Sequence, residues 1–422
     1  MTTQEPLDRS AILARRTRVL APTYQLFYEQ PLQIVRAEGV WMYDEQGRAY
    51  LDAYNNVPVV GHCHPYVVEA LTRQARTLNT HTRYLAELPL QLAEELLATM
   101  PPELGNVVFT CTGSEANDLA VRVSKAVTGG GGFIITDFSY HGVTDVLSGM
   151  SPEDGGPLGP GVYTVPSPAA PGGAAAFAEH VRESIERMRS DGVRLAALIT
   201  DTIFSSDGVF ADPKGFLADA VRHVQVSGGL FIADEVQPGF GRLGEAMWGF
   251  QRHGIVPDLV TMGKPMGNGH PVAAVAARPG VFARFGERRH YFNTYGGNSV
   301  SCAAALAVLH VIRNENLLEN ARRSGEYLKR GLSSLARRCS ALGEVRGAGL
   351  FLGVALSANP VSGLAGGAEA KRVVNGMCRR GVLVGSTGRH GDVLKIRSPL
   401  TFETQHADLL LEVLEQTLNE RD

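Results

Sequence analysis

Short apolar runs that alternate with helical segments are the feature that most constrains how this chain folds. Six such runs lie between residues 107 and 276, and stretches with helical periodicity separate them. They span residues 107–109, 133–135, 195–199, 230–232, 259–260 and 272–276. Continuous apolar strands separated by helices are typical of a parallel sheet that is buried on both faces. The sequence therefore predicts an α/β fold with a mostly parallel central sheet covered by helices.

The two ends of the chain predict a second, smaller unit. Residues 40–52 hold two strand-like runs around a Gln46-Gly47 turn, which is typical of a β-hairpin. An alanine-rich helical run leads from Ser299 to Gly343, and strand-like runs follow at residues 345–356 and 382–396. We expect these parts to form a small α+β unit beside the main sheet.

The length of 422 residues suggests two or three domains. We expect residues 1–60 to join the small domain, residues 61–300 to form the large domain, and residues 301–422 to form the C-terminal small domain. A Pro- and Gly-rich loop at residues 151–173 shows no periodicity. Its length suggests an excursion towards an active site or a subunit contact.

Composition excludes several classes of function. Hydrophobic residues make up 44% of the chain, charged residues 20%, and the formal net charge is −3, so we expect no nucleic-acid partner. Five cysteines without paired spacing favour a reduced, cytoplasmic setting over a disulfide framework. The N-terminus lacks the basic and apolar regions of a secretory signal, and we find no apolar stretch of about 18 residues to span a membrane.

Lys264 and Asp234 form the most informative pair of charged residues. Lys264 lies in the turn Gly263-Lys264-Pro265-Met266-Gly267, and Asp234 ends the apolar run at residues 230–233. Such a turn can hold a deprotonated amine against a cofactor and partly out of water. An acid at the carboxyl end of a buried strand can keep a pyridine nitrogen protonated. The pair points to pyridoxal 5'-phosphate (PLP) and to two catalytic residues, whereas the alternative for each is an ordinary solvated charge.

Gly113 and Ser114 follow a strand and open a helix. Free amides and the helix dipole at such a position can bind a phosphate group. The alternative is that Ser114 simply caps the helix.

Tyr140 and His141 follow the strand at residues 133–136, at the end where ligands of such sheets bind. A flat ring there can stack on a cofactor, although a buried tyrosine in a turn is an equal alternative. The glycine-rich turn at residues 292–298, which includes Thr294, is also suited to an anion.

These motifs resemble, in the same order, those of the class III aminotransferases, a family of fold-type I PLP enzymes. The resemblance extends from about Ile34 to the C-terminus. It rests on Gly61-His62-Cys63-His64-Pro65, Gly113-Ser114-Glu115-Ala116-Asn117, Tyr140-His141-Gly142, Asp234-Glu235-Val236-Gln237, Gly239-Phe240-Gly241-Arg242, Lys264, Thr294-Tyr295-Gly296-Gly297-Asn298 and Arg346-Gly347-Ala348-Gly349-Leu350.

The resemblance implies a role for each residue around the cofactor ring. Lys264 would form the Schiff base, and Asp234 would pair with the pyridine nitrogen. Tyr140 would stack on the ring, with Val236 on its other face and Gln237 near its phenolic oxygen.

The resemblance also implies the contacts to the cofactor's phosphate. Gly113 and Ser114 would hold the phosphate, and His141 would join the cofactor-binding residues beside the ring. Thr294 would reach the phosphate of the neighbouring subunit's cofactor, so a homodimer with shared active sites is implied.

A narrower resemblance concerns the ethanolamine-phosphate and phosphohydroxylysine phospho-lyases, which eliminate phosphate and ammonia instead of transferring an amine. It rests on Asn55-Asn56-Val57, Gly61-His62-Cys63-His64-Pro65, Leu78-Asn79-Thr80, Gly263-Lys264-Pro265-Met266-Gly267-Asn268-Gly269-His270-Pro271 and Tyr291-Phe292-Asn293-Thr294-Tyr295-Gly296-Gly297-Asn298.

The chain departs from ordinary class III transaminases at the substrate end. Where many have an arginine that clamps a carboxylate, this chain has Lys395, which cannot make that planar contact. Arg397 either replaces the missing guanidinium or faces solvent. Either Lys395 and Arg397 bind a substrate anion together, or a carboxylate such as Asp392 pairs with one of them. Ser206 stands where ornithine and aminobutyrate aminotransferases have a glutamate that can pair with the arginine.

We expect no metal site. His62, Cys63 and His64 are adjacent, but consecutive side chains of an extended segment point in opposite directions, and no second ligand pair is spaced to complete a zinc site.

The leading prediction is a PLP-dependent aminotransferase that moves an amino group from a small amine or amino acid to a keto acid. The alternative is a PLP-dependent phospho-lyase that acts on a phosphorylated amine. Both begin with proton removal by Lys264. They differ in what holds the departing group.

Overall fold

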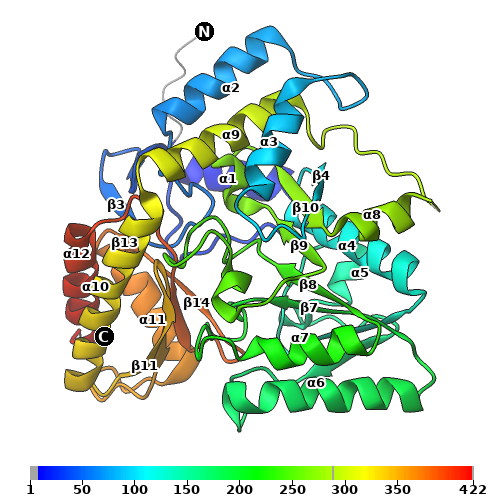
Figure 1. The fold of residues 1–422 in the computed structure, drawn as a ribbon. Helices are drawn as coiled ribbons and strands as arrows, with labels where there is room; N and C mark the ends of the chain where they lie inside the picture. Colours follow the sequence, from blue (N-terminus) through cyan, green and yellow to red (C-terminus); the bar gives the residue numbers. More distant parts are fainter. Residues whose placement is uncertain (1–7, 288, 421–422) are drawn as a thin grey trace.

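The computed structural model describes residues 8–287 and 289–420. Seven strands form its central sheet, in the order β4-β10-β9-β8-β7-β5-β6 (Figure 1). Only β10 runs antiparallel to its neighbours, β4 and β9, so the predicted mostly parallel sheet is confirmed. The strands are β4 (Asn106–Thr110), β5 (Gly132–Thr136), β6 (Val162–Val165), β7 (Leu195–Asp201), β8 (Leu230–Asp234), β9 (Leu259–Met262) and β10 (Ala273–Ala277).

Helices cover both faces of this sheet. Ile134 and Leu198 pack into the core that includes α6 and α7, whereas Ile135 and Ile199 pack with α4 on the other face. Alternate side chains of a strand point to opposite faces, so both sets must be apolar, which explains the continuous apolar runs. The helices of this part are α2 (Pro65–Thr77), α3 (Glu87–Leu97), α4 (Gly113–Thr128), α5 (Asp145–Ser148), α6 (Gly173–Ser190), α7 (Leu217–Val226) and α8 (Pro279–Gly286), with 3-10 turns η1 (Pro152–Asp154), η2 (Gly249–His253) and η3 (Lys264–Gly267).

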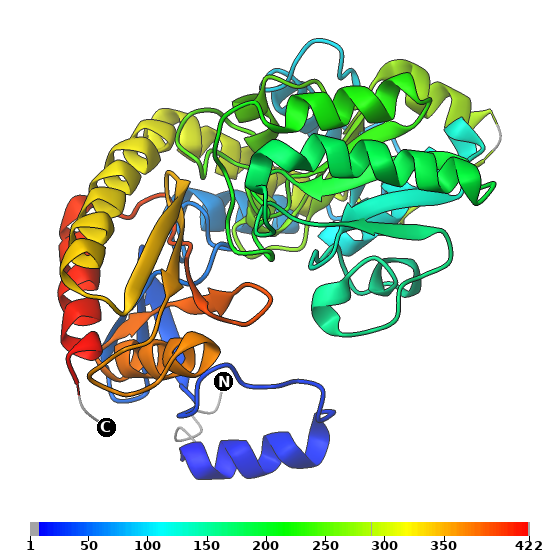
Figure 2. The same cartoon turned by 90° about the horizontal axis from the view of Figure 1, so that it is seen from below.

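The two ends of the chain build two four-stranded sheets, β1-β2-β3-β13 and β11-β12-β15-β14. β2 and β3 form the predicted hairpin, and β3 pairs with β13, so strands from both ends of the chain share one sheet. Helix α12 packs against α10 (Leu317–Arg338) and α11, and these two helices contact strands β11 and β13 of the sheets (yellow to red in Figure 2). The domain boundaries at residues 60 and 300 stay predictions. The elements are α1 (Arg9–Val19), β1 (Ile34–Glu38), β2 (Trp41–Asp44), β3 (Ala49–Asp52), β11 (Leu342–Ala348), β12 (Phe351–Leu356), α11 (Gly366–Arg379), β13 (Val382–Leu383), β14 (Gly385–Thr387), β15 (Val393–Ile396) and α12 (Thr404–Leu418).

Two sequence expectations need correction. The helical run after Ser299 is two helices, α9 (Ser299–Asn314) and α10 (Leu317–Arg338), because Asn316 adopts a left-handed conformation with φ +52°. The loop at residues 151–173 contains η1 and β6, and β6 is the edge strand paired with β5. A four-residue strand between glycines and prolines is too short for its periodicity to be recognised.

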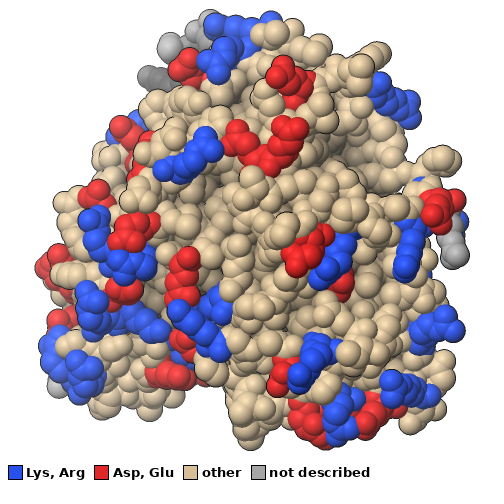
Figure 3. Space-filling view, viewed as in Figure 1, with Lys and Arg blue, Asp and Glu red and all other residues tan. Residues whose placement is uncertain are grey.

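The surface carries both signs of charge. On the face shown in Figure 3, basic and acidic side chains are interspersed. No helix within residues 8–287 and 289–420 is long and apolar enough to cross a membrane. The cytoplasmic location stays a prediction.

Candidate active site

The carboxyl ends of the parallel strands surround one cavity of about 340 Å³. This position follows from the fold, because loops at the carboxyl ends of such strands form the ligand-binding crevice. Eight predicted site residues line the cavity, and they come from four separate segments: Gly113, Ser114, Tyr140, His141, Asp234, Val236, Gln237 and Lys264.

Lys264 begins η3, directly after β9, and its side chain projects into the cavity. The side chain is exposed to the cavity, yet protein surrounds it, and this burial lowers the pKa of Lys264 to about 8, with a further contribution from Arg397. Its backbone φ of +32° lies in the left-handed region that favours glycine. A non-glycine residue there costs about 1–3 kcal/mol, and such strain is common at functional sites. The turn therefore supplies an amine that loses its proton at a lower pH than an ordinary lysine.

Asp234 ends β8 and is buried, with three groups that fix its carboxylate. Oδ2 accepts hydrogen bonds from Asn117 Nδ2 (2.9 Å) and pairs with His141 Nδ1 (2.8 Å), while Oδ1 accepts one from Val236 N (3.2 Å). These contacts fix the orientation of a carboxylate that lines the cavity. Asp234 can therefore hold a proton on a basic nitrogen in the cavity.

Asn117 acts as a positioning residue, a role that the sequence motif alone did not predict. It lies on the buried face of α4, and its Oδ1 accepts from Thr261 Oγ1 (2.6 Å). Its Nδ2 also donates to the His141 carbonyl (2.8 Å). A buried asparagine among the apolar positions of a helix was the available signal, because buried polar groups need partners.

The start of α4 has the features of a phosphate cradle. The Thr112 side chain, not that of Ser114, caps the helix by accepting from Glu115 N (3.1 Å), so the N-cap alternative for Ser114 is wrong. A Cβ at Gly113 would come within 2.9 Å of Val236, so only glycine leaves this edge of the cavity open. The first amides of α4 and the Ser114 hydroxyl are suited to an anion.

Gln237 has its amide oriented by two donors. Its Oε1 accepts from Asn56 Nδ2 (2.9 Å) and from Arg397 Nη1 (2.8 Å). The oxygen is thus occupied, which leaves the Nε2 donor for an acceptor in the cavity. Asn56 is a second positioning residue that the sequence did not assign, and it joins the N-terminal segment to this site.

Lys395 and Arg397, called the cation pair below, lie next to each other at the end of β15. Both are buried, and both charged groups approach the Phe351 ring, at 5.8 Å for Lys395 and 6.0 Å for Arg397. Neither forms an ion pair with a carboxylate in the part of the chain that the structure describes, and Arg397 Nε has no hydrogen-bond partner there. Burial and mutual repulsion lower the pKa of Lys395, and burial lowers that of Arg397.

These contacts decide between the alternatives for the cation pair. Arg397 does not face solvent, because it is 8% exposed and reaches Gln237 at the cavity wall. Asp392 pairs with neither cation; its charge acts on Arg346 instead. Two buried cations without a carboxylate partner are costly unless an anion joins them.

Three predicted site residues lie outside the cavity lining: Lys395, Arg397, which contacts the lining residue Gln237, and Thr294. Thr294 is exposed on the turn before α9 and does not line the cavity of its own chain. Its predicted contact with a neighbouring subunit's cofactor stays a prediction.

His62 and His64, which flank Cys63, bind different partners. His62 pairs with Asp52 (2.7 Å) and His64 with Glu315 (3.0 Å). No group of three His, Cys, Asp or Glu suited to a metal ion occurs among the described residues.

The donor set of the cavity fits PLP. It offers an amine on a strained turn, a fixed carboxylate, the amide donor of Gln237, and a helix start that only glycine leaves open. Tyr140 and Val236 line the same cavity and supply flat and apolar surface for a ring.

Comparisons with known proteins agree with this geometry. The family model of the class III aminotransferases matches residues 24–418. A phospholyase from Arthrobacter, solved with phosphoethanolamine, is 41% identical, with a TM-score of 0.92 over 96% of this chain and 99% of that one.

Two relatives carry different names. Alanine–glyoxylate aminotransferase 2-like of Drosophila melanogaster is 38% identical over 97% of this chain and 87% of its own. Ethanolamine-phosphate phospho-lyase homolog 1 of Caenorhabditis elegans is 34% identical over 99% of this chain and 95% of its own. The sequence-predicted membership is therefore confirmed: this chain belongs to the class III aminotransferases, the PLP-dependent family of fold type I.

Proposed function

We propose that this enzyme binds PLP in the cavity and removes phosphate and ammonia from a small phosphorylated amine. The observation that carries the proposal is the cation pair, which is buried beside the cavity without a carboxylate partner among the described residues. A phosphate monoester carries about −1.5 to −2 charges at pH 7 and three acceptor oxygens. Two cations match this group better than they match a carboxylate.

Lys264 and Asp234 would perform the proton chemistry. PLP, when bound, draws electrons away from the amine-bearing carbon of the substrate, so that a proton on that carbon becomes acidic. The neutral Lys264 amine accepts this proton, a role that its lowered pKa of about 8 favours. Asp234 keeps the ring nitrogen protonated, and Gln237 donates to the phenolic oxygen.

The cation pair would hold the leaving group. With ethanolamine phosphate, the proton leaves the amine-bearing carbon, and the C–O bond to phosphate on the next carbon breaks. The bonding electrons depart with the phosphate, where Lys395 and Arg397 stabilise the charge. Water then replaces the nitrogen, so that one substrate and one water give acetaldehyde, ammonia and phosphate.

Two relatives support this reaction, since the Arthrobacter structure contains phosphoethanolamine and the Caenorhabditis elegans relative is named a phospho-lyase homolog. Transamination between a small amine and a keto acid is the second candidate, favoured by the family and by the name of the Drosophila melanogaster relative. Both reactions use Lys264 and Asp234 in the same way.

We expect Lys395→Met and Arg397→Met each to raise KM for ethanolamine phosphate by about 10- to 100-fold, because each removes one cation from a desolvated anion contact. The wild-type enzyme should release phosphate from ethanolamine phosphate. The measurement follows phosphate release, and in parallel alanine formation from a panel of amines plus pyruvate.

The control is Lys371→Met, which removes an exposed charge far from the cavity and should leave KM unchanged. Turnover of an uncharged amine should also be nearly unchanged in the cation-pair variants. Equal losses on charged and uncharged substrates would contradict the anion role, and alanine formation without phosphate release would favour transamination.

A homodimer with shared active sites is part of this proposal. Exposed apolar side chains gather around a groove beside the turn that carries Thr294. Such a patch supports a surface that a second subunit covers. They are Tyr84, Leu85, Leu90 and Phe292, all of which line the groove. A second copy on this groove would bring Thr294 towards its neighbour's cavity.

We expect Leu85→Glu to produce monomers and to weaken PLP retention, because a charge would be buried at the interface and the site would lose its neighbour's contact. Sedimentation velocity and cofactor content measure both effects. The matched control is Val226→Glu on α7, where an apolar residue 76% exposed lies away from the groove. A monomeric wild-type enzyme with full PLP content would refute the shared site.

A further inference from the structure

The turn η1 brings an acidic side chain towards the cation pair. Glu153 lies on η1, and its backbone amide donates to the Ser139 carbonyl (3.2 Å), one residue before Tyr140. Its carboxylate oxygen Oε2 accepts a hydrogen bond from Ser206 Oγ (2.7 Å). Glu153 is exposed and Ser206 is buried, so the serine holds the carboxylate at the edge of the site.

Ser206 is joined to the strands that carry the cation pair. Its carbonyl accepts from Gly388 N (3.0 Å) and from Thr387 Oγ1 (3.2 Å), at the end of β14. β14 pairs with β15 so that Gly385 lies opposite Lys395. The Glu153 carboxylate is therefore anchored to the same strand pair.

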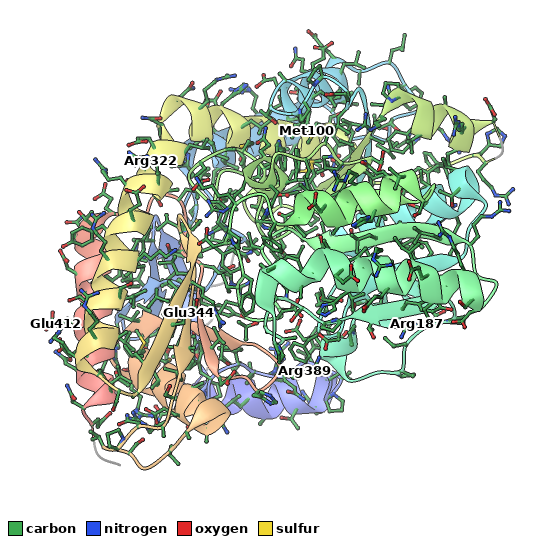
Figure 4. All side chains as sticks on the ribbon, turned by 60° about the horizontal axis from the view of Figure 1, so that its bottom comes forward. Met100, Arg187, Arg322, Glu344, Arg389 and Glu412 are labelled. Carbon is green, nitrogen blue, oxygen red and sulfur yellow. The ribbon has the colours of Figure 1, made fainter. Side chains whose placement is uncertain are left out.

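A second contact fixes the hairpin β14–β15 to the main sheet. Arg389, labelled in Figure 4, lies in the turn of this hairpin and pairs with Asp137 (2.7 Å), which follows β5. The loop after β5 also leads to η1. The hairpin thus contacts Asp137 directly and is linked to Glu153 through Ser206.

The charge of Glu153 acts on the cation pair. Burial is the first cause that lowers the pKa of Lys395 and of Arg397. The Glu153 carboxylate opposes this effect on both, together with Asp201 on Lys395 and with Tyr54 and Asp52 on Arg397. The Glu153 carboxylate also opposes the effect of burial on the pKa of Lys264. Glu153 therefore offsets part of the positive charge that the fold concentrates at this end of the cavity.

We infer that Glu153 is the internal counter-charge of the cation pair: held by Ser206, it stabilises the pair while no anion is bound, and it competes with an incoming anion. Ser206 stands where ornithine and aminobutyrate aminotransferases have a glutamate. In this chain a carboxylate from another loop binds to that serine. The inference rests on the proposed function, because the anion that Glu153 opposes is the phosphate group of the substrate.

We expect Glu153→Gln to bind sulfate about three- to tenfold more tightly than the wild type, because a negative charge near the anion is removed. Sulfate serves as the probe because it stays doubly charged near neutral pH. Binding is measured by calorimetry on the PLP-loaded enzyme, in which the cofactor occupies the phosphate cradle. Glutamine keeps the shape of glutamate, so the exposed turn should fold normally. Ser206→Ala should also tighten binding, because the carboxylate is then no longer held.

The matched control is Asp154→Asn, which removes the same charge from the same turn. Asp154 is not among the leading causes of the pKa shifts of Lys395 or Arg397, so sulfate affinity should stay within about twofold of wild type. Unchanged or weaker binding in Glu153→Gln overturns the inference, as does equal tightening in Asp154→Asn. Wild-type affinity in Ser206→Ala overturns the role of Ser206.

Lys395→Met separates this inference from the proposed function. If Lys395→Met binds sulfate as well as the wild type, the anion site itself is refuted. If Lys395→Met weakens binding while Glu153→Gln has no effect, only the counter-charge is refuted.

Discussion

Lys264→Ala should lower turnover by at least about a thousandfold, the largest effect that we expect from any single substitution. The variant loses both the amine that attaches the cofactor and the base that moves the substrate proton, and general acid–base catalysis alone contributes about 10²- to 10⁴-fold. Borohydride reduction followed by peptide mass spectrometry should find the cofactor's mass on the Lys264 peptide of the wild type and on no peptide of the variant.

The control for this experiment is Lys214→Ala, which removes an exposed lysine paired with Glu245. It should retain wild-type turnover and cofactor attachment. If Lys264→Ala kept turnover or the cofactor's covalent attachment, the assignment of the catalytic amine would be wrong.

Asp234→Asn should lower kcat by about a hundredfold, which corresponds to about 3 kcal/mol of lost transition-state stabilisation. An amide cannot keep the ring nitrogen protonated, so proton removal from the substrate slows. The variant should still bind PLP, because the phosphate cradle and Lys264 are intact. The measurement combines kcat with cofactor content after dialysis.

The matched control is Asp201→Asn. Asp201 lies opposite Asp234 in the register of β7 and β8 and also lines the cavity, but its oxygens accept from the amides of Ile203 and Ser205. The substitution Asp201→Asn should reduce kcat less than Asp234→Asn does. Equal effects would mean that net charge matters and the position of Asp234 does not.

Anion recognition links the two ends of the site. Arg397 donates to Gln237, and Asn56 fixes the same amide oxygen. In the proposed function, the residue that would hold the leaving group is therefore in contact with the residue that would donate to the cofactor ring. We expect this contact to influence the choice between transamination and elimination, because the proton chemistry is common to both reactions.

The sequence by itself determined the central sheet and the residues at its carboxyl edge. Apolar runs with helices between them require a sheet buried on both faces, and Asp234 and Lys264 follow two of its strands directly. The order of strands and motifs along the chain is enough to place these residues, since parallel strands bring their carboxyl ends to one edge of the sheet.

Only the tertiary structure decided the surroundings of the substrate anion. Asn56, Glu153 and Arg397 come from segments far apart in the chain. The contacts of Asn56 and Arg397 with Gln237 are set by how the small sheets pack against the large one, whereas Glu153 meets Ser206 between two loops of the large sheet. Whether Arg397 faces solvent or the cavity depends on that packing and not on its strand periodicity. Charge pairing in a buried site is fixed by three-dimensional distance, which a sequence pattern does not encode.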